Sequence, residues 1–330
     1  MKKCALLLTV VTVMMFASAA FAADKIVVGF AQIGAESDWR VANTKSIQDA
    51  CAAAGIDLRF VDGQQKQENQ IKALRDFITM GVDVIGFSPV VESGWDEIIA
   101  EINEAGIPLI LSDRTTDIAG DDYFVTWMGS DFKEEGVRSA NWLVNFLKEN
   151  GRDKDEINIV ELQGTVGSGP AIDRKKGFEE VIKDYPNLKI TQSQTGDFTR
   201  DLGRTVMESF LKSGERIDVL YAHNDDMGLG AVQAIKDAGL KPGTDIIIIG
   251  VDAVKAAFEA IVAGEMNVTV ECSPLLGPQF VDAVQKIMAG ETLPKITWTI
   301  EHVYDLRKEN LEMDGYVIMS AEAELPNRQY

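Results

Sequence analysis

Short runs of apolar residues, rich in valine and isoleucine, recur along the chain and are separated by longer segments with a helical period. The runs cover 26–33, 56–61, 82–88, 108–113, 157–164, 218–224 and 246–252. Between the first two runs, Ile47, Cys51 and Ala54 fall on one side of a helix. Because strands that alternate with helices form βαβ units, the pattern predicts an α/β fold with parallel sheets covered on both faces.

The N-terminal segment has the pattern of a secretory signal peptide. Two lysines are followed by an apolar stretch over 5–16 and by Ala20-Phe21-Ala22, which fits a cleavage site after Ala22. The apolar stretch is too short to span a membrane. Cys4 lies ahead of that stretch rather than at the cleavage site, which argues against a lipid anchor. We therefore expect an exported protein without a membrane anchor.

Length and composition exclude some classes of protein. A chain of 330 residues with 46% hydrophobic residues can fill two domain cores. The net charge is −20 and no basic stripe is visible, which argues against a nucleic-acid partner. Beyond the predicted leader only Cys51 and Cys272 remain, too few for a disulfide framework, and we expect no disulfide between them.

Polar and aromatic side chains follow the predicted strands at their carboxyl ends. In open parallel sheets, ligands bind beyond those ends. A set of planar polar groups and flat rings at that edge suits a polyhydroxylated ligand. We expect the glycine-rich turn 164–169 to bring backbone amides and a serine near the same ligand. The candidates at these strand ends are Glu36, Trp39, Asp113, Arg114, Ser168 and Asn224.

Each candidate also has a structural interpretation. Trp39 could be a half-buried packing residue, and Asp113 with Arg114 could be an ordinary exposed ion pair. The Asn-Asp-Asp segment 224–226 could simply cap the helix that follows it, because Asn and Asp are preferred N-caps. We expect Trp39 to stack on the ligand and Asn224 to point into the cleft. One of the two aspartates, Asp225 or Asp226, is then expected to cap the helix and to be chiefly structural.

Motifs for metal binding and catalysis are missing from the sequence. The only histidines are His223 and His302, and no H-E-x-x-H, C-x-x-C or EF-hand pattern occurs. The glycine-rich turn 164–169 lacks the Lys-Ser/Thr of a phosphate loop, and no G-x-S-x-G elbow is present. The sequence therefore predicts no metal, no cofactor and no enzyme activity, although its many acidic residues leave a two-carboxylate hydrolase open.

Several segments together resemble the ribose/galactose group of periplasmic sugar-binding proteins, the type I solute receptors of ABC importers. Within that group, the galactofuranose-binding branch is the most similar. The resemblance covers about 23–300 and lies in DWR (38–40), SDR (112–114), AIDRKKGF (171–178), GDFTR (196–200), YAHNDDM (221–227) and GVDA (250–253).

The resemblance implies two Rossmann-like lobes with parallel sheets, joined by a three-strand hinge and closing around a ligand. The N-terminal lobe would comprise 23–131 plus 272–296, and the C-terminal lobe 132–271 plus 297–330, with the last 25 or so residues unplaced. Arg40 would join Trp39, Asp113 and Arg114 on the first lobe. The remaining contacts implied by the resemblance are Arg174, Phe198, Asn224, Asp252 and Glu271.

The function implied by the resemblance is capture of a monosaccharide in the periplasm, galactofuranose or a related hexose or pentose. A monomer would deliver it to an inner-membrane ABC permease. Two alternatives stay open: a receptor of the same fold for a non-sugar, furanone-type ligand, and a periplasmic carbohydrate-active enzyme. A transcription regulator with this fold is disfavoured by the export signal and by the lack of an N-terminal helix-turn-helix.

Overall fold

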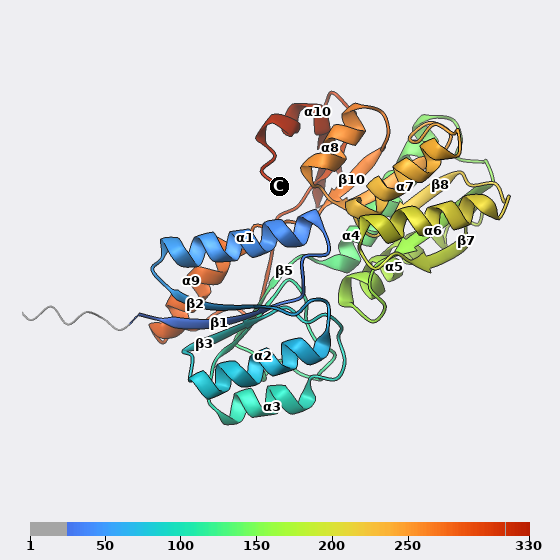
Figure 1. Cartoon of the computed structure of the whole chain (residues 1–330). Coiled ribbons are helices and arrows are strands. Elements are labelled where there is room, and N and C mark those ends of the chain that lie inside the picture. The colour runs from blue at the N-terminus through green and yellow to red at the C-terminus, as the bar shows by residue number, and fades with distance from the viewer. Residues whose placement is uncertain (1–24, 314) are drawn as a thin grey trace, which may run out of the picture.

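The computed structural model describes residues 25–313 and 315–330 and contains two α/β lobes, each built around one sheet (Figure 1). The predicted signal peptide, with its cleavage site after Ala22, lies outside the described residues. Among the described residues, none of the helices combines the length and the apolar character needed to cross a membrane. The alternating pattern of the sequence thus leads to the α/β architecture that it predicts.

The first lobe has six strands, all of them parallel, with helices on both faces (Figure 1). Helices α1 (Asp38–Ala53) and α9 (Gly277–Met288) cover one face, while α2 (Gln67–Met80) and α3 (Asp96–Glu104) cover the other. Separate apolar clusters fill the two interfaces between sheet and helices. In sheet order the strands are β11 (Ile296–Trp298), β5 (Thr126–Gly129), β4 (Leu109–Ser112), β3 (Val84–Phe87), β1 (Val27–Gln32) and β2 (Asp57–Asp62).

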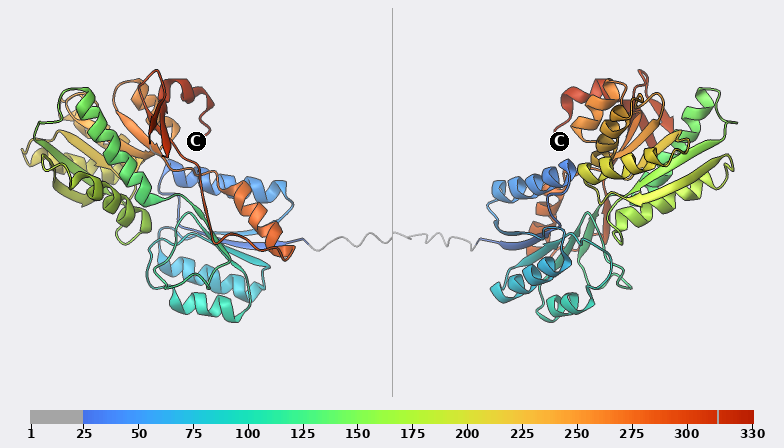
Figure 2. Two further views of the ribbon diagram at one scale, coloured as in Figure 1. Left: turned by 180° about the vertical axis from the view of Figure 1, so that it is seen from behind. Right: turned by 45° about the vertical axis from the view of Figure 1, so that its right-hand side comes forward.

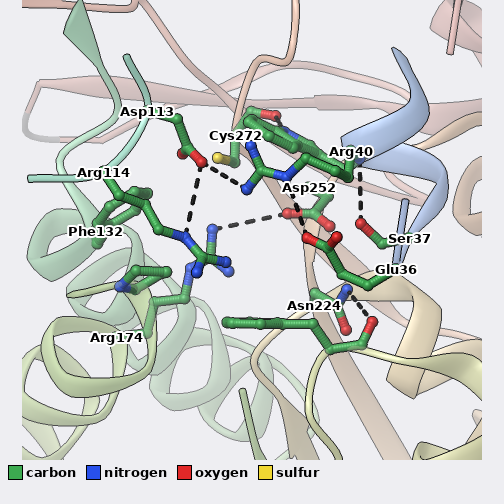
Figure 3. A pocket seen from close by; sticks show the side chains of 13 residues that line it. Glu36, Ser37, Arg40, Asp113, Arg114, Phe132, Arg174, Asn224, Asp252 and Cys272 are labelled. Atoms are coloured by element: carbon green, nitrogen blue, oxygen red, sulfur yellow. Dashed lines mark hydrogen bonds and ion pairs between the residues drawn. The ribbon is translucent and has the colours of Figure 1, made fainter. Parts of the chain in front are cut away.

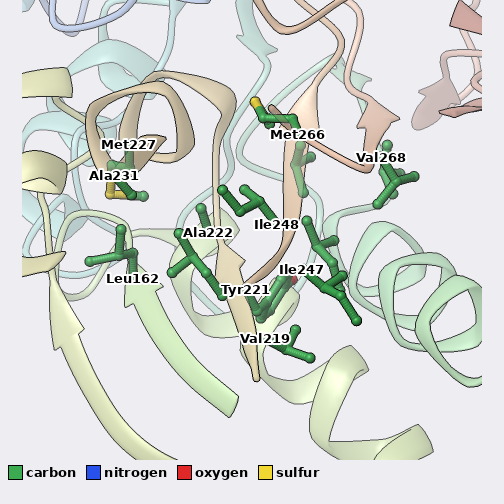
Figure 4. Packing of buried hydrophobic residues seen from close by; sticks show 14 of the residues in the cluster. Leu162, Val219, Tyr221, Ala222, Met227, Ala231, Ile247, Ile248, Met266 and Val268 are labelled. Atoms are coloured by element: carbon green, nitrogen blue, oxygen red, sulfur yellow. The ribbon is translucent and has the colours of Figure 1, made fainter. Parts of the chain in front are cut away.

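The second lobe has eight strands. In sheet order they are β13 (Leu311–Met313), β14 (Tyr316–Ser320), β12 (Val303–Asp305), β10 (Val268–Glu271), β9 (Ile247–Asp252), β8 (Val219–Ala222), β6 (Ile157–Gln163) and β7 (Leu188–Thr195). The five from β7 to β10 are parallel, and β12 then pairs antiparallel with β10. Figure 4 shows how side chains of β6, β8 and β9, such as Leu162, Tyr221 and Ile248, form the core of this lobe.

Helices cover this second sheet as they cover the first. Those of the second lobe are α4 (Phe132–Glu149), α5 (Gly169–Ile182), α6 (Arg200–Lys212), α7 (Asp225–Asp237), α8 (Lys255–Val262), α10 (Ala321–Glu324) and the short 3₁₀ helix Leu325–Asn327. The helix pairs α4–α5 and α6–α7 approach each other through glycine. A Cβ on Gly136 would collide with the carbonyl oxygen of Arg174, and one on Gly230 with that of Arg200. These glycines therefore set the spacing of both pairs.

The chain passes between the lobes three times, and we call residues 130–131, 272–276 and 299–302 the three crossings. Figure 2 shows these narrow connections from two further directions. Glu301 joins them, because its Oε1 accepts hydrogen bonds from Ser130 Oγ (2.5 Å), Thr299 Oγ1 (2.6 Å) and Ser273 N (2.9 Å). The lobe boundaries inferred from the sequence remain a proposal, and β11 extends the first sheet to Trp298.

Candidate ligand-binding site

A small cavity lies between the two lobes, where the carboxyl ends of both sheets face each other. Figure 3 shows its side chains converging from the loop before α1, the end of β4, the start of α4, and α5, α7 and β9. Its lining residues are Glu36, Ser37, Trp39, Arg40, Asp113, Arg114, Phe132, Pro170, Arg174, Phe198, Asn224, Asp252 and Cys272. The site thus lies where the strand-end rule for parallel sheets puts it.

The first turn of α1 contributes Trp39 and Arg40. Ser37 caps this helix, because its side chain accepts a hydrogen bond from Arg40 N (3.1 Å). Trp39 is only 4% exposed, and its Nε1 donates to the carbonyl oxygen of Cys272 (2.6 Å) in the second crossing. The Arg40 guanidinium lies 4.5 Å from the centre of the Trp39 ring, within cation–π range. Trp39 is therefore held in place by contacts at its edge and over its ring.

Arg40 is the centre of a buried ion-pair network. Its Nη2 donates to Asp113 Oδ2 (2.6 Å), its Nε to Glu36 Oε1 (3.1 Å) and its Nη1 to Gln32 Oε1 (3.2 Å). Burial alone would lower the pKa of Arg40, but Asp113 and Glu36 outweigh burial and raise it. Asp113 adopts a left-handed backbone with φ of 67° at the end of β4, which turns its carboxylate toward Arg40. Arg40 thereby fixes both acids at the cavity wall.

Arg114 is less fully paired than Arg40. Its Nη1 donates to the carbonyl oxygen of Val90 (2.9 Å). Its buried Nε lies 3.8 Å from Asp113 Oδ2, an ion pair too long for a hydrogen bond, and has no hydrogen-bond partner among the described residues. Burial, together with the nearby Arg40 cation, lowers the pKa of Arg114 to about 10. The guanidinium lies 5.3 Å from the centre of the Phe198 ring on the opposite lobe. Arg114 therefore offers donor capacity to a bound molecule.

The second lobe contributes Arg174 and Asp252. Arg174 Nε donates to Glu135 Oε2 (2.7 Å), and its Nη1 donates to the carbonyl oxygen of His223 (2.6 Å). Its Nη2 lies 3.7 Å from Asp252 Oδ1. Burial would lower the pKa of Arg174, but Glu135 and other acidic groups raise it above its usual range. Burial raises the pKa of Asp252 well above its usual range, against the effect of Arg174, and so favours its protonated form.

The Asn-Asp-Asp segment at the start of α7 has three separate roles. Asn224 caps the helix, with Oδ1 accepting from Met227 N (3.0 Å), while Nδ2 donates to the carbonyl oxygen of Phe198 (3.1 Å). Asp225 accepts from Thr269 Oγ1 (2.8 Å) and Val254 N (3.0 Å). Asp226 reaches the other lobe, where it accepts from Asp38 N (2.8 Å).

The expectation that an aspartate caps α7 is therefore wrong. Asn224 has the extended backbone of an N-cap, with φ of −150° and ψ of 166°, whereas both aspartates already lie inside the first helical turn. Their carboxylates point to other elements instead. Asn224 nevertheless lines the cavity, so it combines the capping role with the position that the sequence predicted for it.

Nine of the eleven residues selected from the sequence line the cavity, and Ser168 and Glu271 do not. Ser168 Oγ donates to the carbonyl oxygen of Thr165 (2.7 Å) within its own turn. Glu271 turns toward the C-terminal segment, where it binds Arg328 Nη1 (2.8 Å) and Tyr304 Oη (3.2 Å). Because side chains alternate along an extended chain, the next residue, Cys272, faces the cavity in place of Glu271.

Sequence reasoning missed Ser37, Phe132, Pro170 and Cys272. Phe132 and Cys272 follow β5 and β10, two strands of four residues that were not among the predicted apolar runs. Had those strands been recognised, the same strand-end rule would have selected both residues. Ser37 could have been found as the N-cap ahead of Trp39. Pro170, at the start of α5, carries no signal of a binding role.

Comparison with known proteins gives a consistent result. The family model described as periplasmic binding protein domain matches residues 28–292. The chain is 48% identical over 297 residues to the galactofuranose-binding protein YtfQ of Escherichia coli K12, covering 88% of this chain and 92% of that protein.

Two solved structures are similar along most of the chain. A Mycobacterium smegmatis protein in complex with β-D-fucofuranose has a TM-score of 0.86 and 50% identity, with 92% of this chain and 95% of that one covered. The periplasmic binding protein of the arabinose ABC transporter of Shewanella sp. ANA-3, bound to α- and β-L-arabinofuranose, has a TM-score of 0.83 and 45% identity, with the same coverage.

Proposed function

The chain belongs to the periplasmic binding protein family, and from this membership we propose that it is the substrate-binding protein of a sugar ABC importer. Its ligand is a monosaccharide in the furanose form, held in the cavity between the lobes. The similar proteins bind galactofuranose, fucofuranose and arabinofuranose, which share a five-membered ring and differ in the exocyclic group. Recognition of the ring rather than of one complete sugar would account for that range.

The observation that carries this proposal is the composition of the cavity wall. Three guanidinium groups, three carboxyl groups and one amide line it, together with flat rings from both lobes. A sugar presents hydroxyl groups that both donate and accept hydrogen bonds, and C–H faces that pack against aromatic rings. Two buried atoms without a hydrogen-bond partner among the described residues, Arg114 Nε and Glu36 Oε2, supply one donor and one acceptor for such hydroxyls.

We propose that nine of the residues selected from the sequence contact the sugar directly. In this arrangement the Trp39 and Phe198 rings cover apolar faces, and the charged groups and the amide bind hydroxyls. Phe132 and Cys272 add an apolar corner, and Ser168 and Glu271 are left out because they lie outside the cavity. The nine residues are Glu36, Trp39, Arg40, Asp113, Arg114, Arg174, Phe198, Asn224 and Asp252.

A role in sugar import has consequences for where the protein is located and which proteins it binds. Membership of the periplasmic binding protein family supports a location in the periplasm. We propose that the leader is cleaved after Ala22, that the mature protein carries no lipid, and that it delivers the sugar as a monomer to an inner-membrane ABC permease. We propose binding without turnover, because Asp113 and Glu36 are held in ion pairs with Arg40 rather than poised as an acid and a base.

A panel of free sugars tests this function, with thermal unfolding as the measurement. D-Galactose, D-fucose and L-arabinose should raise the melting temperature, because a ligand specific for the folded state stabilises it by RT ln(1 + [L]/Kd). 4-Deoxy-D-galactose cannot close a furanose ring and should have no effect. Stabilisation by the 4-deoxy sugar would disprove furanose recognition. Stabilisation by a furanone but by none of the sugars would favour the non-sugar receptor, and release of product from an oligosaccharide would favour the enzyme.

A further inference from the structure

A second contact between the lobes lies outside the cavity and consists of Asp38, Arg200 and Asp226. Arg200 Nη2 donates to Asp38 Oδ2 (2.9 Å) and to Asp226 Oδ1 (2.6 Å), and Arg200 Nε also donates to Asp226 Oδ1 (3.0 Å). Asp38 is the first residue of α1 in the first lobe, whereas Arg200 and Asp226 lie in the first turns of α6 and α7 in the second. Figure 1 shows the start of α1 directed toward the starts of α6 and α7. We call these three residues the latch.

The latch uses the end of a helix as well as an ion pair. Asp226 Oδ2 accepts a hydrogen bond from the backbone N–H of Asp38 (2.8 Å), the first residue of α1. The first N–H groups of a helix have no partner within the helix and carry partial positive charge. Ser37 satisfies one of them from within the first lobe, and Asp226 satisfies another from the second lobe. When the lobes separate, the Asp38 N–H loses this charged acceptor.

Arg200 determines the sign of the charge interaction. Asp38 and Asp226 are both acidic and face each other across the lobe boundary, so without a cation between them they would repel. Burial and the Asp38 carboxylate raise the pKa of Asp226, and Arg200 counteracts that shift. The side chain of Asp226 is almost fully buried, while those of Asp38 and Arg200 are 57% and 46% exposed. Removing Arg200 should therefore turn an attraction between the lobes into a repulsion.

We propose that Arg200 and Asp226 are affinity-determining residues that hold the two lobes closed over the ligand, although neither lines the cavity. The inference rests on the proposed function, because it concerns capture of the same sugar. A contact made only when the lobes are closed raises the closed population and so lowers the apparent Kd. Its effect should appear mainly in the dissociation rate, because the ligand leaves when the lobes open.

The first experiment compares Arg200→Gln with Arg204→Gln in L-arabinose binding, measured by calorimetry and stopped flow. Arg204 lies on the same helix with similar exposure, but its partners Glu208 and Asp237 belong to the same lobe. Arg200→Gln should raise Kd roughly threefold to tenfold through faster dissociation, and Arg204→Gln should leave it unchanged. Adding Asp38→Asn to Arg200→Gln should recover part of the affinity, because it removes the repulsion. A loss of affinity that Asp38→Asn does not reduce would overturn the charge mechanism.

The second experiment measures lobe opening without ligand. Spin labels at Lys72→Cys on α2 and Lys212→Cys on α6 report the distance between the lobes, and both positions are exposed. Cys51 is buried in the core of the first lobe, whereas Cys272 lines the cavity and becomes accessible when the lobes open, so every labelled variant also carries Cys272→Ala. Arg200→Gln should shift the distance distribution toward longer values, and Arg204→Gln should not. If the wild type binds none of the sugars, the proposed function fails, and only the label distances then test the latch. In that case, an Arg200→Gln distance distribution equal to that of the wild type overturns the latch. An unchanged dissociation rate in Arg200→Gln would also overturn it.

Discussion

At the scale of single residues, Trp39 combines two roles that can be separated experimentally. Its indole Nε1 donates to the Cys272 carbonyl oxygen and thereby joins α1 to the second crossing. Its ring lines the cavity, where we propose that it covers an apolar face of the sugar. The hydrogen bond affects how the first lobe is held against the second crossing, whereas the proposed stacking affects direct contact with the ligand.

We expect Trp39→Ala to weaken sugar binding by about 1–3 kcal/mol, because stacking and apolar burial are both lost. Trp39→Phe keeps a ring but removes the Nε1 donor, so its affinity should fall between those of wild type and Trp39→Ala. Calorimetry gives the affinities and thermal unfolding of the free proteins gives their stability. If Trp39→Ala keeps its affinity while its melting temperature drops sharply, Trp39 is a packing residue and the stacking proposal is wrong.

The start of α7 shows what a sequence can and cannot reveal about single residues. The strand end at 222 identifies a segment that borders the cavity, and Asn224 lines it. Which of three adjacent residues caps the helix depends on the backbone angles of one position, and Asn and Asp are nearly equal as caps. The role of Asp226 depends on Asp38, which is 188 residues away in the chain, so no local pattern could indicate it.

At the scale of elements, the three crossings depend on one buried carboxyl group. Glu301 accepts hydrogen bonds from donors on all three crossings, and the carboxylate of Glu135 lies close to it. Burial and, in addition, the negative charge of Glu135 raise the pKa of Glu301 to about 8. Protonation at this position is therefore linked to stability of the folded chain.

We expect Glu301→Gln to remove part of the pH dependence of stability. In the unfolded chain a glutamate loses its proton near pH 4.3, whereas folded Glu301 keeps it until about pH 8. Between those values folding takes up a proton, so the wild type loses stability as pH rises, and the uncharged glutamine does not. The free energy of unfolding of Glu301→Gln relative to wild type should rise between pH 5 and pH 8, by roughly 1–3 kcal/mol.

Denaturant unfolding at several pH values measures this difference. Glu312→Gln, on the exposed side of β13, serves as the control and should follow the wild type at every pH. If Glu301→Gln and wild type show parallel pH profiles, Glu301 is ionised in the folded protein and the linkage is wrong.

The elements that the sequence predicted differ physically from those it missed. Long apolar runs became the central strands, such as 246–252, which contains β9 (Ile247–Asp252) with every residue buried. Strands β5 (TWMG) and β10 (VTVE) are as short as the predicted β3, β4 and β8, but β5 contains no valine or isoleucine and β10 alternates apolar with polar residues, so neither forms a valine- and isoleucine-rich run. The C-terminal strands β12 and β13 have three residues each, and they are strands only because neighbouring chain segments pair with them. Tertiary pairing thus defines what local pattern cannot.

At the scale of the whole molecule, the structure has the lobes closed upon each other. Glu92 N of the first lobe donates to the carbonyl oxygen of Gly167 of the second (2.9 Å), and Arg114 lies over the Phe198 ring. The cavity wall is completed by residues of both lobes. A ligand can reach such a site only if the lobes separate, which is the hinge motion typical of periplasmic receptors.

We expect the radius of gyration from small-angle X-ray scattering to fall when the proposed sugar binds. A ligand that contacts both lobes stabilises the closed state by its differential affinity for that state. Saturation should be confirmed separately by calorimetry at the same concentrations. A radius that stays constant in saturated protein would show that binding proceeds without closure.

The glycine contacts between paired helices bear on any attempt to evolve this protein toward another sugar. Gly136 packs against the backbone of Arg174, which lines the cavity, and Gly230 against the backbone of Arg200, which belongs to the latch. A methyl group at either glycine would push a whole helix aside and move the arginine with it. Mutant libraries that vary the cavity wall should therefore keep both glycines. Selection then acts on side-chain chemistry, while the positions of Arg174 and Arg200 relative to the cavity and the latch are preserved.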